Sequence, residues 1–210
     1  MKAQTSFVDH LNKTNDTHWV YQSITTWASF SKDRSELKQL TSLGLNTFYF
    51  LKGILATDNI HAYLGCYKQG IYLHFIPSSV DHKKSFQDQK TIPNELYSCL
   101  ATQDSYPDKG AIDKKEAEQR IHNWDNDKLR NQVLDAPELF QVFWMPNENF
   151  KNNTPLKVNF AINKDQPDLV LTRMDKANSY LDTCKPIPPF GIATKSSDFA
   201  LLEQVKLWGI

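Results

Sequence analysis

The stretch that decides the fold is IHAYLGCYKQGIYLHFI, residues 60–76, in which two apolar runs flank a short polar turn. Side chains alternate between the two faces of a strand, so one face of this predicted hairpin is apolar and belongs to the core. A turn at Gln69-Gly70, where glycine accepts positive φ, pairs Cys66 with Leu73. Moving the turn by one residue at each side shifts the pairing by two and leaves the faces unchanged. The apolar face carries Ile60, Ala62, Leu64, Cys66, Leu73 and Phe75.

The opposite face of the hairpin, which we call the Tyr/His face, gathers imidazoles and phenols. It carries His61, Tyr63, Tyr67, Tyr72 and His74. So many aromatic and imidazole groups are more than a solvated surface usually holds. Two alternatives follow: a second layer covers the face and hydrogen-bonds its polar tips, or a ligand binds it. These five residues are the candidate ligand-binding residues.

His61 and His74 also raise the question of a metal-dependent or hydrolytic enzyme. With Asp58 or Asp81 near the hairpin's ends, they offer the imidazole and carboxylate ligands that divalent metals use. Hydrogen-bonded burial is the commoner state of such residues, and we predict no metal and no cofactor. Cys66 lies on the apolar face, which favours a buried thiol over a nucleophile. The chain has no GxGxxG, Walker-type, HExxH, GxSxG or CxxC motif.

The composition is that of a globular protein without charge bias. The 210 residues, 40% of them hydrophobic, suit one large domain or two small ones. Since 24 basic residues balance 24 acidic ones, neither nucleic acid nor an anionic membrane is favoured as a partner. The lack of a signal-like start or a long apolar run predicts a soluble cytoplasmic protein. Cys66, Cys99 and Cys184 lack metal-ligand spacing and predict no disulfide framework.

A helix, strand and hairpin order is predicted twice along the chain. Before the Tyr/His hairpin come helices over residues 19–30 and 33–43, the second ended by Gly44, and a central strand at 48–51. A polar connector, residues 83–110, follows, with a short helix near residues 93–100. The later elements are a helix capped by Asp113 and running to Trp124, a helical turn at 129–134, a strand at 140–145 and a hairpin of 156–162 with 169–174.

This recurrence predicts an α+β protein with an internal duplication. Ile24-Thr25-Thr26-Trp27 falls on Ile121-His122-Asn123-Trp124, and a chance repeat of a common unit is the alternative. The predicted organisation is a first unit at 1–82, a second at 111–176, and a Pro-rich strap with a C-terminal helix, capped by Ser197 or Asp198, at 177–210. The antiparallel strands form one continuous sheet or two facing ones. The second hairpin's outer face, with Lys157, Asn159, Ala161 and Thr172, is predicted to be an ordinary solvated face.

Residues 112–124, IDKKEAEQRIHNW, followed by a strand closing at Met145-Pro146, resemble a group of short uncharacterised bacterial proteins. In that group an acidic-capped helix with a late Ile-x-x-Trp signature precedes an apolar strand. The resemblance implies a bacterial protein of unknown function and brings no site residues with it. From the residues themselves we predict a non-catalytic binding or interaction module. Its Tyr/His face would contact a small ligand, a protein partner or a second copy of the chain.

Overall fold

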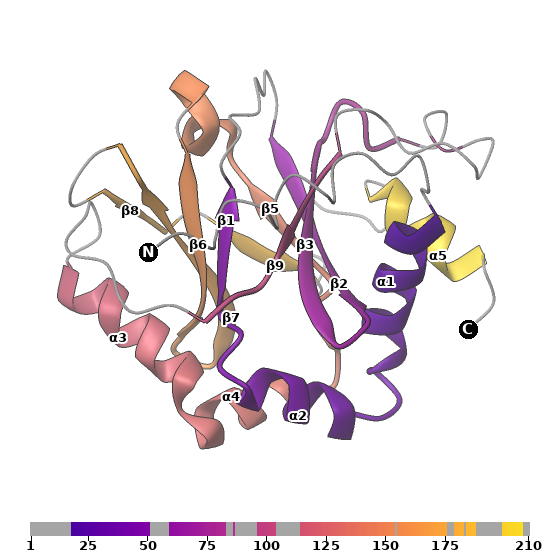
Figure 1. Ribbon diagram of the computed structural model, residues 1–210, viewed down its shortest axis with the longest axis horizontal. Helices are drawn as coiled ribbons and strands as arrows, with labels where there is room; N and C mark the ends of the chain where they lie inside the picture. The colour runs from indigo at the N-terminus through magenta and orange to yellow at the C-terminus, as the bar shows by residue number, and fades with distance from the viewer. Residues whose placement is uncertain are drawn as a thin grey trace, which may run out of the picture.

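The computed structural model describes residues 18–50, 59–82, 86, 96–103, 114–153, 155–175, 179–182, 184–187 and 199–207, and combines helices with two antiparallel sheets (Figure 1). The sheets have the strand orders β1-β6-β7-β8 and β4-β3-β2-β5-β9. The α+β class and the C-terminal helix are therefore confirmed. In chain order the elements are α1 (His18–Ser29), α2 (Ser35–Ser42), β1 (Thr47–Phe50), β2 (Ile60–Tyr67), β3 (Gly70–Pro77), β4 (Tyr97–Leu100), α3 (Lys114–Asp125), α4 (Asp127–Leu134), β5 (Val142–Met145), η3 (Asn147–Asn153), β6 (Leu156–Asn163), β7 (Gln166–Arg173), β8 (Tyr180–Leu181), β9 (Lys185–Ile187) and α5 (Ala200–Leu207).

The two halves of the chain exchange their short strands. β1 pairs with β6 of the second half, and β5 pairs with β2 of the first, each in an antiparallel register. In both pairs the last residue of the short strand lies opposite the first residue of the hairpin: Phe50 opposite Leu156, and Met145 opposite Ile60. This repeated register is what a duplication would leave, but descent from a duplicated unit stays a prediction.

The position of β1 differs from the expected central strand, because β1 forms an edge of its sheet. Its outer side is not open along its whole length: Thr47 forms a bridge with Thr102, which follows β4 of the other sheet. Phe48 and Phe50 are nevertheless buried at 0% and 2% exposure, because they face the opposing sheet. An apolar run therefore identified a buried strand and not its place in the sheet.

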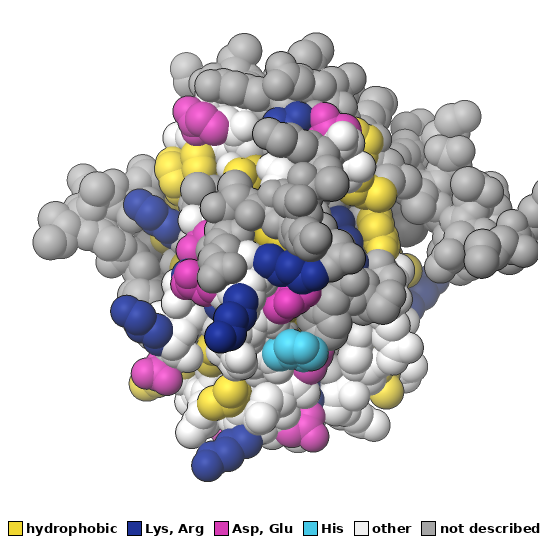
Figure 2. Space-filling view, turned by 90° about the vertical axis from the view of Figure 1, so that its left-hand side faces the viewer, with side chains coloured by type: hydrophobic (Ala, Val, Ile, Leu, Met, Phe, Trp, Pro, Cys, Tyr) yellow, Lys and Arg dark blue, Asp and Glu magenta, His cyan; other side chains and the backbone are white. Residues whose placement is uncertain are grey.

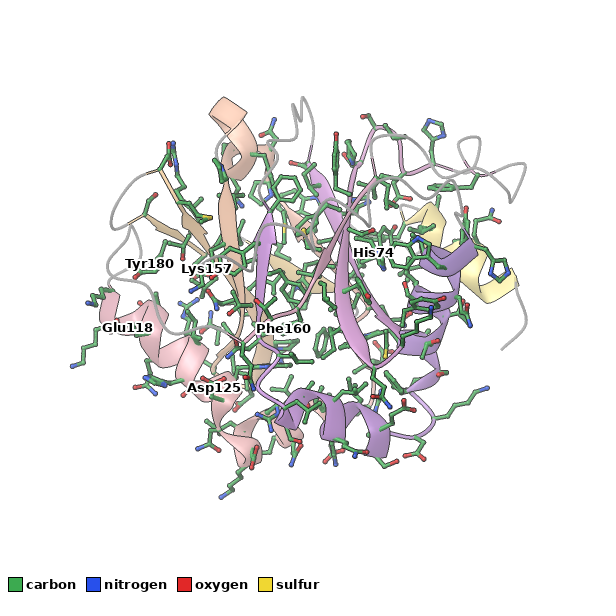
Figure 3. All side chains as sticks on the ribbon, in the orientation of Figure 1. His74, Glu118, Asp125, Lys157, Phe160 and Tyr180 are labelled. Carbon is green, nitrogen blue, oxygen red and sulfur yellow. The ribbon has the colours of Figure 1, made fainter. Side chains whose placement is uncertain are left out.

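The core lies between the facing sheets. β2 contributes Ile60, Ala62 and Leu64 to it, and β6 contributes Leu156, Val158 and Phe160, all fully buried. Phe160 lies inside the molecule (Figure 3) and its ring stacks on that of Trp124 at 4.5 Å. Each of these side chains except that of Ala62 stabilises the fold by about 1.5–3 kcal/mol relative to exposure. α3 flanks one side of the sheets and α1 with α5 flanks the other (Figure 1).

The hairpin of β2 and β3 has the predicted faces with a register shifted by two residues. Leu64 lies opposite Leu73 and Cys66 opposite Ile71. The turn residues are Lys68 and Gln69, with φ of 47° and 62°, and not Gln69-Gly70. A two-residue turn with positive φ at both positions matches the twist of the flanking strands, which outweighs the preference for glycine in the turn.

In the connector and the tail, the observed elements differ from those that the local sequence pattern predicts. The short helix predicted near residues 93–100 is wrong over Tyr97–Leu100, which form β4 and pair with β3. The exposed edge of β3 offers this segment backbone partners that a helix of one turn could not match. In the tail, β9 pairs with β5 and accommodates Pro186 because it is an edge strand. None of the described helices is long and apolar enough to cross a membrane.

Candidate functional site

The Tyr/His face lies beneath a layer of two helices. α1 packs Val20 and Ile24 in one cluster with Tyr63, and α5 adds Leu201 and Leu202. Of the two alternatives left open by the sequence, the covering layer is the one that the structure has. Exposure is 4% for His61, 0% for Tyr63, 7% for Tyr72 and 0% for His74, and Tyr67 is half-buried.

Asp81 is the charged centre of this layer. It follows β3 in a turn in which its N–H donates to the Pro77 carbonyl at 3.1 Å, and its side chain is fully buried. The carboxylate accepts hydrogen bonds from His61 Nδ1 at 2.6 Å and from the hydroxyl of Tyr63. Its other oxygen accepts from the Leu201 N–H at 3.1 Å.

Asp81 therefore caps α5 from a distant part of the chain. The first N–H groups of a helix have no partner within the helix, and Leu201 is in the first turn. The predicted capping residues Ser197 and Asp198 lie outside the described residues. Burial, and then the charge of Asp81, raise the pKa of Tyr63 well above 10, so its phenol remains a donor at neutral pH. His61, Tyr63 and α5 are thus tied to one carboxylate.

His74 is held as a neutral ring between two serines. Its Nε2 lies 2.7 Å from Ser23 Oγ, and its Nδ1 lies 2.7 Å from Ser98 Oγ. Ser23 donates its single proton to the Val20 carbonyl at 2.8 Å, so it accepts from Nε2–H, and Nδ1 accepts from Ser98. A Cβ on Gly65 would lie 2.6 Å from both Nε2 and Ser23 Oγ, so glycine makes room for this contact.

The pH dependence of stability should carry the signature of His74. Burial lowers its pKa from 6.5 to about 3, so its contribution is present above pH 6.5 and is lost as the pH falls toward 3. The loss is about 1.4 kcal/mol per pH unit. Asp168 acts in the opposite sense, because burial raises its pKa from 3.8 to about 7. We therefore expect the unfolding free energy of the wild type to decrease relative to that of His74→Gln as the pH is lowered from 7 to 4, measured by urea denaturation. A constant difference would contradict a neutral His74.

The candidate metal ligands do not come together as a group of three in the described part of the chain. His61 lies opposite Ile76 in the hairpin, and His74 lies opposite Tyr63. Asp81 contacts His61 as the sequence allowed, whereas Asp58 lies outside the described residues. Among the residues that the structure describes, no three His, Cys, Asp or Glu side chains are placed to hold a metal ion.

Cys66 and Cys99 do not offer reactive thiols. Burial raises the pKa of Cys66 to about 11 and that of Cys99 to about 12. Both thiols are therefore protonated at neutral pH, which disfavours nucleophilic chemistry. The placement of Cys66 on the apolar face is confirmed by its inclusion in the core between the sheets.

The outer face of the second hairpin is not the solvated surface that was predicted. Lys157, Asn159, Ala161 and Thr172 are 0–6% exposed. α3 crosses this face and packs Ala117 and Ile121 against Ala161. The prediction of a solvated second hairpin is therefore wrong, because the first helix of each half covers a hairpin: α1 lies against β2, and α3 lies against β6. Lys157 and Tyr180 lie on this side of the molecule (Figure 3).

An ionic cluster ties α3 to its sheet. Arg120 pairs with Asp168 at 3.1 Å, with Glu116 one turn away, and with Asp182. Burial and then the charge of Asp182 raise the pKa of Asp168, while Arg120 opposes the shift. Basic and acidic side chains are interspersed over this face of the molecule (Figure 2). The cluster is accounted for by the attachment of α3 and β8 to β7.

A polar hollow of about 500 Å³ lies at the end of the molecule where α2 and α3 end and α4 begins. It joins the two predicted units, since α2 belongs to the first and α4 to the second. Asp125 lies at this end of α3 (Figure 3). The polar hollow is lined by Ser42, Gly44, Asn46, Gln103, Asp125, Asp127 and Arg130.

Hydrogen bonds fix the walls of the polar hollow. Asn46 Nδ2 donates to Asp125 Oδ1 at 2.8 Å, and the side-chain amide of Gln103 donates to the Leu43 carbonyl. Gly44, with φ of +73°, turns the chain out of α2 toward β1. These bonds join the end of α2, the segment after β4 and the end of α3. The walls are therefore formed before any ligand arrives.

Arg130 is the buried charge of the polar hollow. It is 4% exposed, and its guanidinium donates to the Trp124 carbonyl at 3.0 Å and to Asp127. Its Nε has no acceptor among the described residues. A buried guanidinium nitrogen without a partner costs stability, and Arg34 Nη1 is a second such nitrogen among the described residues.

Little in the sequence pointed to the polar hollow, because its residues come from three separate segments of the chain, 42–46, 103 and 125–130. One local signal existed: Asp125-Asn126-Asp127 places two carboxylates around an Asn that caps α4 by accepting from Lys128 and Leu129.

Comparison of the chain with protein-family models, with curated proteins and with solved structures finds no match.

Proposed function

We propose that this protein is a non-catalytic binding protein and that its ligand occupies the polar hollow. The observation that carries the proposal is the lining itself, in which carboxylates, amides and a buried Arg130 surround about 500 Å³ at the junction of two halves. Sites for small molecules are concave and place a few polar groups on pre-formed walls. The hydrogen bonds of Asn46 and Gln103 supply that pre-formation.

The Tyr/His face is a poorer candidate for the contact surface than the polar hollow. A ligand could reach Tyr63 or His74 only after α1 or α5 moved, because both side chains are fully buried. His61, Tyr63 and His74 already have hydrogen-bond partners within the protein. These partners also support a non-catalytic role, since a general acid or base must reach its substrate.

The test is a titration of ¹⁵N-labelled protein with a panel of small amines, amino acids, sugars and carboxylates. We expect at least one compound to move the side-chain amide signals of Asn46 and Gln103 and the backbone signal of Gly44. The internal control is the indole signal of Trp19, a residue of α1 whose ring lies 5.3 Å from that of His74 on the Tyr/His face. Shifts confined to that face, or no saturable shift around the polar hollow, would contradict the proposal.

A further inference from the structure

Resting on the proposed function, we propose that the ligand of the polar hollow is a neutral polyol or sugar whose hydroxyl groups bond to Arg130 and to Asp127. Arg130 carries the first step, because it is a buried cation with one unused donor. It is 4% exposed and lines the polar hollow, and its Nε has no acceptor among the described residues. Arg34 Nη1, which also has none, belongs to a residue outside this lining. A ligand oxygen on Nε would therefore satisfy a buried N–H of the binding site itself.

The neighbour of this unused donor is a carboxylate. Nη1 of Arg130 donates to the Trp124 carbonyl at 3.0 Å, and Nη2 donates to Asp127. Because Nε and Nη2 are attached to the same carbon of a planar group, an acceptor that reaches Nε comes close to the carboxylate of Asp127. The ligand must therefore accept from Arg130 at a position where it also meets Asp127.

This pair of requirements separates the ligand classes. An ammonium or guanidinium group has no acceptor and would leave Nε unpaired. A carboxylate or phosphate group accepts from Nε, but it would bring a second negative charge next to Asp127. A hydroxyl group has one donor and two acceptor lone pairs, and it rotates to suit its partners. Hydroxyl groups can therefore accept from Arg130 and donate to Asp127 without changing the charge of the site.

The charges of the lining are also matched within the protein, which favours a neutral ligand. Arg130 is paired with Asp127. Asp125 accepts from Nδ2 of Asn46 at 2.8 Å and has a further interaction within the protein. A volume of about 500 Å³ leaves room for a ligand with several hydroxyl groups, such as a monosaccharide. A polyol of that size would meet polar side chains from all three segments of the lining.

Asp127 is also the part of the site that can move. Its side chain is 80% exposed, whereas that of Arg130 is 5% exposed and Nε is buried. An exposed carboxylate gives up its position at small cost, because solvent screens its ion pair. The movement that admits a hydroxyl group to Nε therefore falls to Asp127, while the Trp124 carbonyl keeps the guanidinium in place.

The same hydroxyl groups have two sources, a free sugar or polyol and the terminal sugar of a glycan. The free probes are therefore glucose and myo-inositol, and the glycan probe is maltotriose. Glutarate, putrescine and butanamide are the anionic, cationic and neutral amide probes. Binding is followed by ¹⁵N NMR through the side-chain amides of Asn46 and Gln103 and through the Nε–H of Arg130. Tighter binding of maltotriose than of both free probes assigns the glycan, and any other order assigns the free compound.

We expect at least one of the three hydroxyl probes to bind saturably and to shift the Nε–H signal of Arg130, which Arg130→Lys identifies by its loss. The Nε–H of Arg173, which already donates to Asp175 at 3.1 Å, is the internal control and should not move. Glutarate, putrescine and butanamide should bind at least roughly tenfold more weakly, because each leaves one of the two contacts poorly made.

Asp127→Asn should weaken the binding of the hydroxyl probe roughly tenfold, because the hydroxyl group then donates to a neutral oxygen. A carboxylate ligand would respond in the opposite sense, since the loss of negative charge would strengthen its binding. Asp135→Asn is the matched control: it removes the same charge from the other end of α4, where Asp135 pairs with Lys38, and should leave the affinity unchanged.

Three kinds of result would overturn the inference. Binding of glutarate, putrescine or butanamide at Asn46 and Gln103, tighter than that of every hydroxyl probe, would reject the ligand class and leave the proposed binding function in place. Hydroxyl binding that leaves the Arg130 Nε–H signal unmoved, or that Asp127→Asn and Asp135→Asn weaken equally, would remove the contacts with Arg130 and Asp127. Saturable binding of no compound at Asn46 and Gln103, here or in the wider panel, would remove the proposed function as well.

Discussion

Replacing Asp81 with Ala is expected to lower the free energy of unfolding by about 3–5 kcal/mol, since each buried donor left without an acceptor costs about 1–3 kcal/mol. The carboxylate is fully buried and serves His61, Tyr63 and the Leu201 N–H together. Alanine would leave three buried donors without an acceptor and would remove the cap of α5. Urea denaturation at pH 7, followed by tryptophan fluorescence, measures the change.

The matched control for Asp81 is Asp135→Ala, which removes an exposed carboxylate paired with Lys38 at 2.7 Å. Exposed pairs contribute little, so this variant should stay within about 1 kcal/mol of wild type. Hydrogen exchange adds a local readout: the Leu201 amide should lose protection in Asp81→Ala and keep it in Asp135→Ala. Equal denaturation midpoints for Asp81→Ala and wild type would show that Asp81 does not anchor this layer.

The parts of the fold that followed from sequence are those encoded by short-range periodicity. Alternation assigned the faces of the hairpin, and Leu64 and Tyr63 lie on opposite sides of it as predicted. Helical spacing likewise placed Ile24 and Ile121 on buried stripes. These patterns are local because a period of 2 or 3.6 is fixed by the backbone geometry of the element itself.

What the sequence could not give is which distant segment each face meets. The Asp81 carboxylate and the Leu201 amide are 120 positions apart, and no local pattern links them. A polar strand face such as Lys157 and Asn159 looks the same whether water or α3 covers it. The polar hollow is harder still, because its walls meet only when α2, α3 and the segment after β4 come together. Tertiary contacts, and not the propensities of single segments, determine the contact of Asp81 with Leu201, the covering of Lys157 and Asn159, and the walls of the polar hollow.

The second large effect is expected for Tyr63→Ser, with a loss of about 3–5 kcal/mol in unfolding free energy, as for deletion of a buried aromatic ring. Tyr63 is 0% exposed and packs among residues of α1 and α5. Serine leaves a cavity between the sheet and both helices, and its hydroxyl does not extend to Asp81. Tyr67→Ser is the control, since Tyr67 is half-buried at the turn and should cost far less.

Tyr63→Phe separates the two causes of that loss. Phenylalanine keeps the ring and removes only the hydroxyl that donates to Asp81, so about 1–3 kcal/mol should be lost. The remaining difference between the Phe and Ser variants then measures packing beneath α1 and α5. If Tyr63→Ser instead kept the wild-type stability but lost binding to a ligand or self-association, the Tyr/His face would be the contact surface after all. If the wild type is the most stable, Tyr63→Phe less stable and Tyr63→Ser the least stable, the Tyr/His face belongs to the interior of the protein.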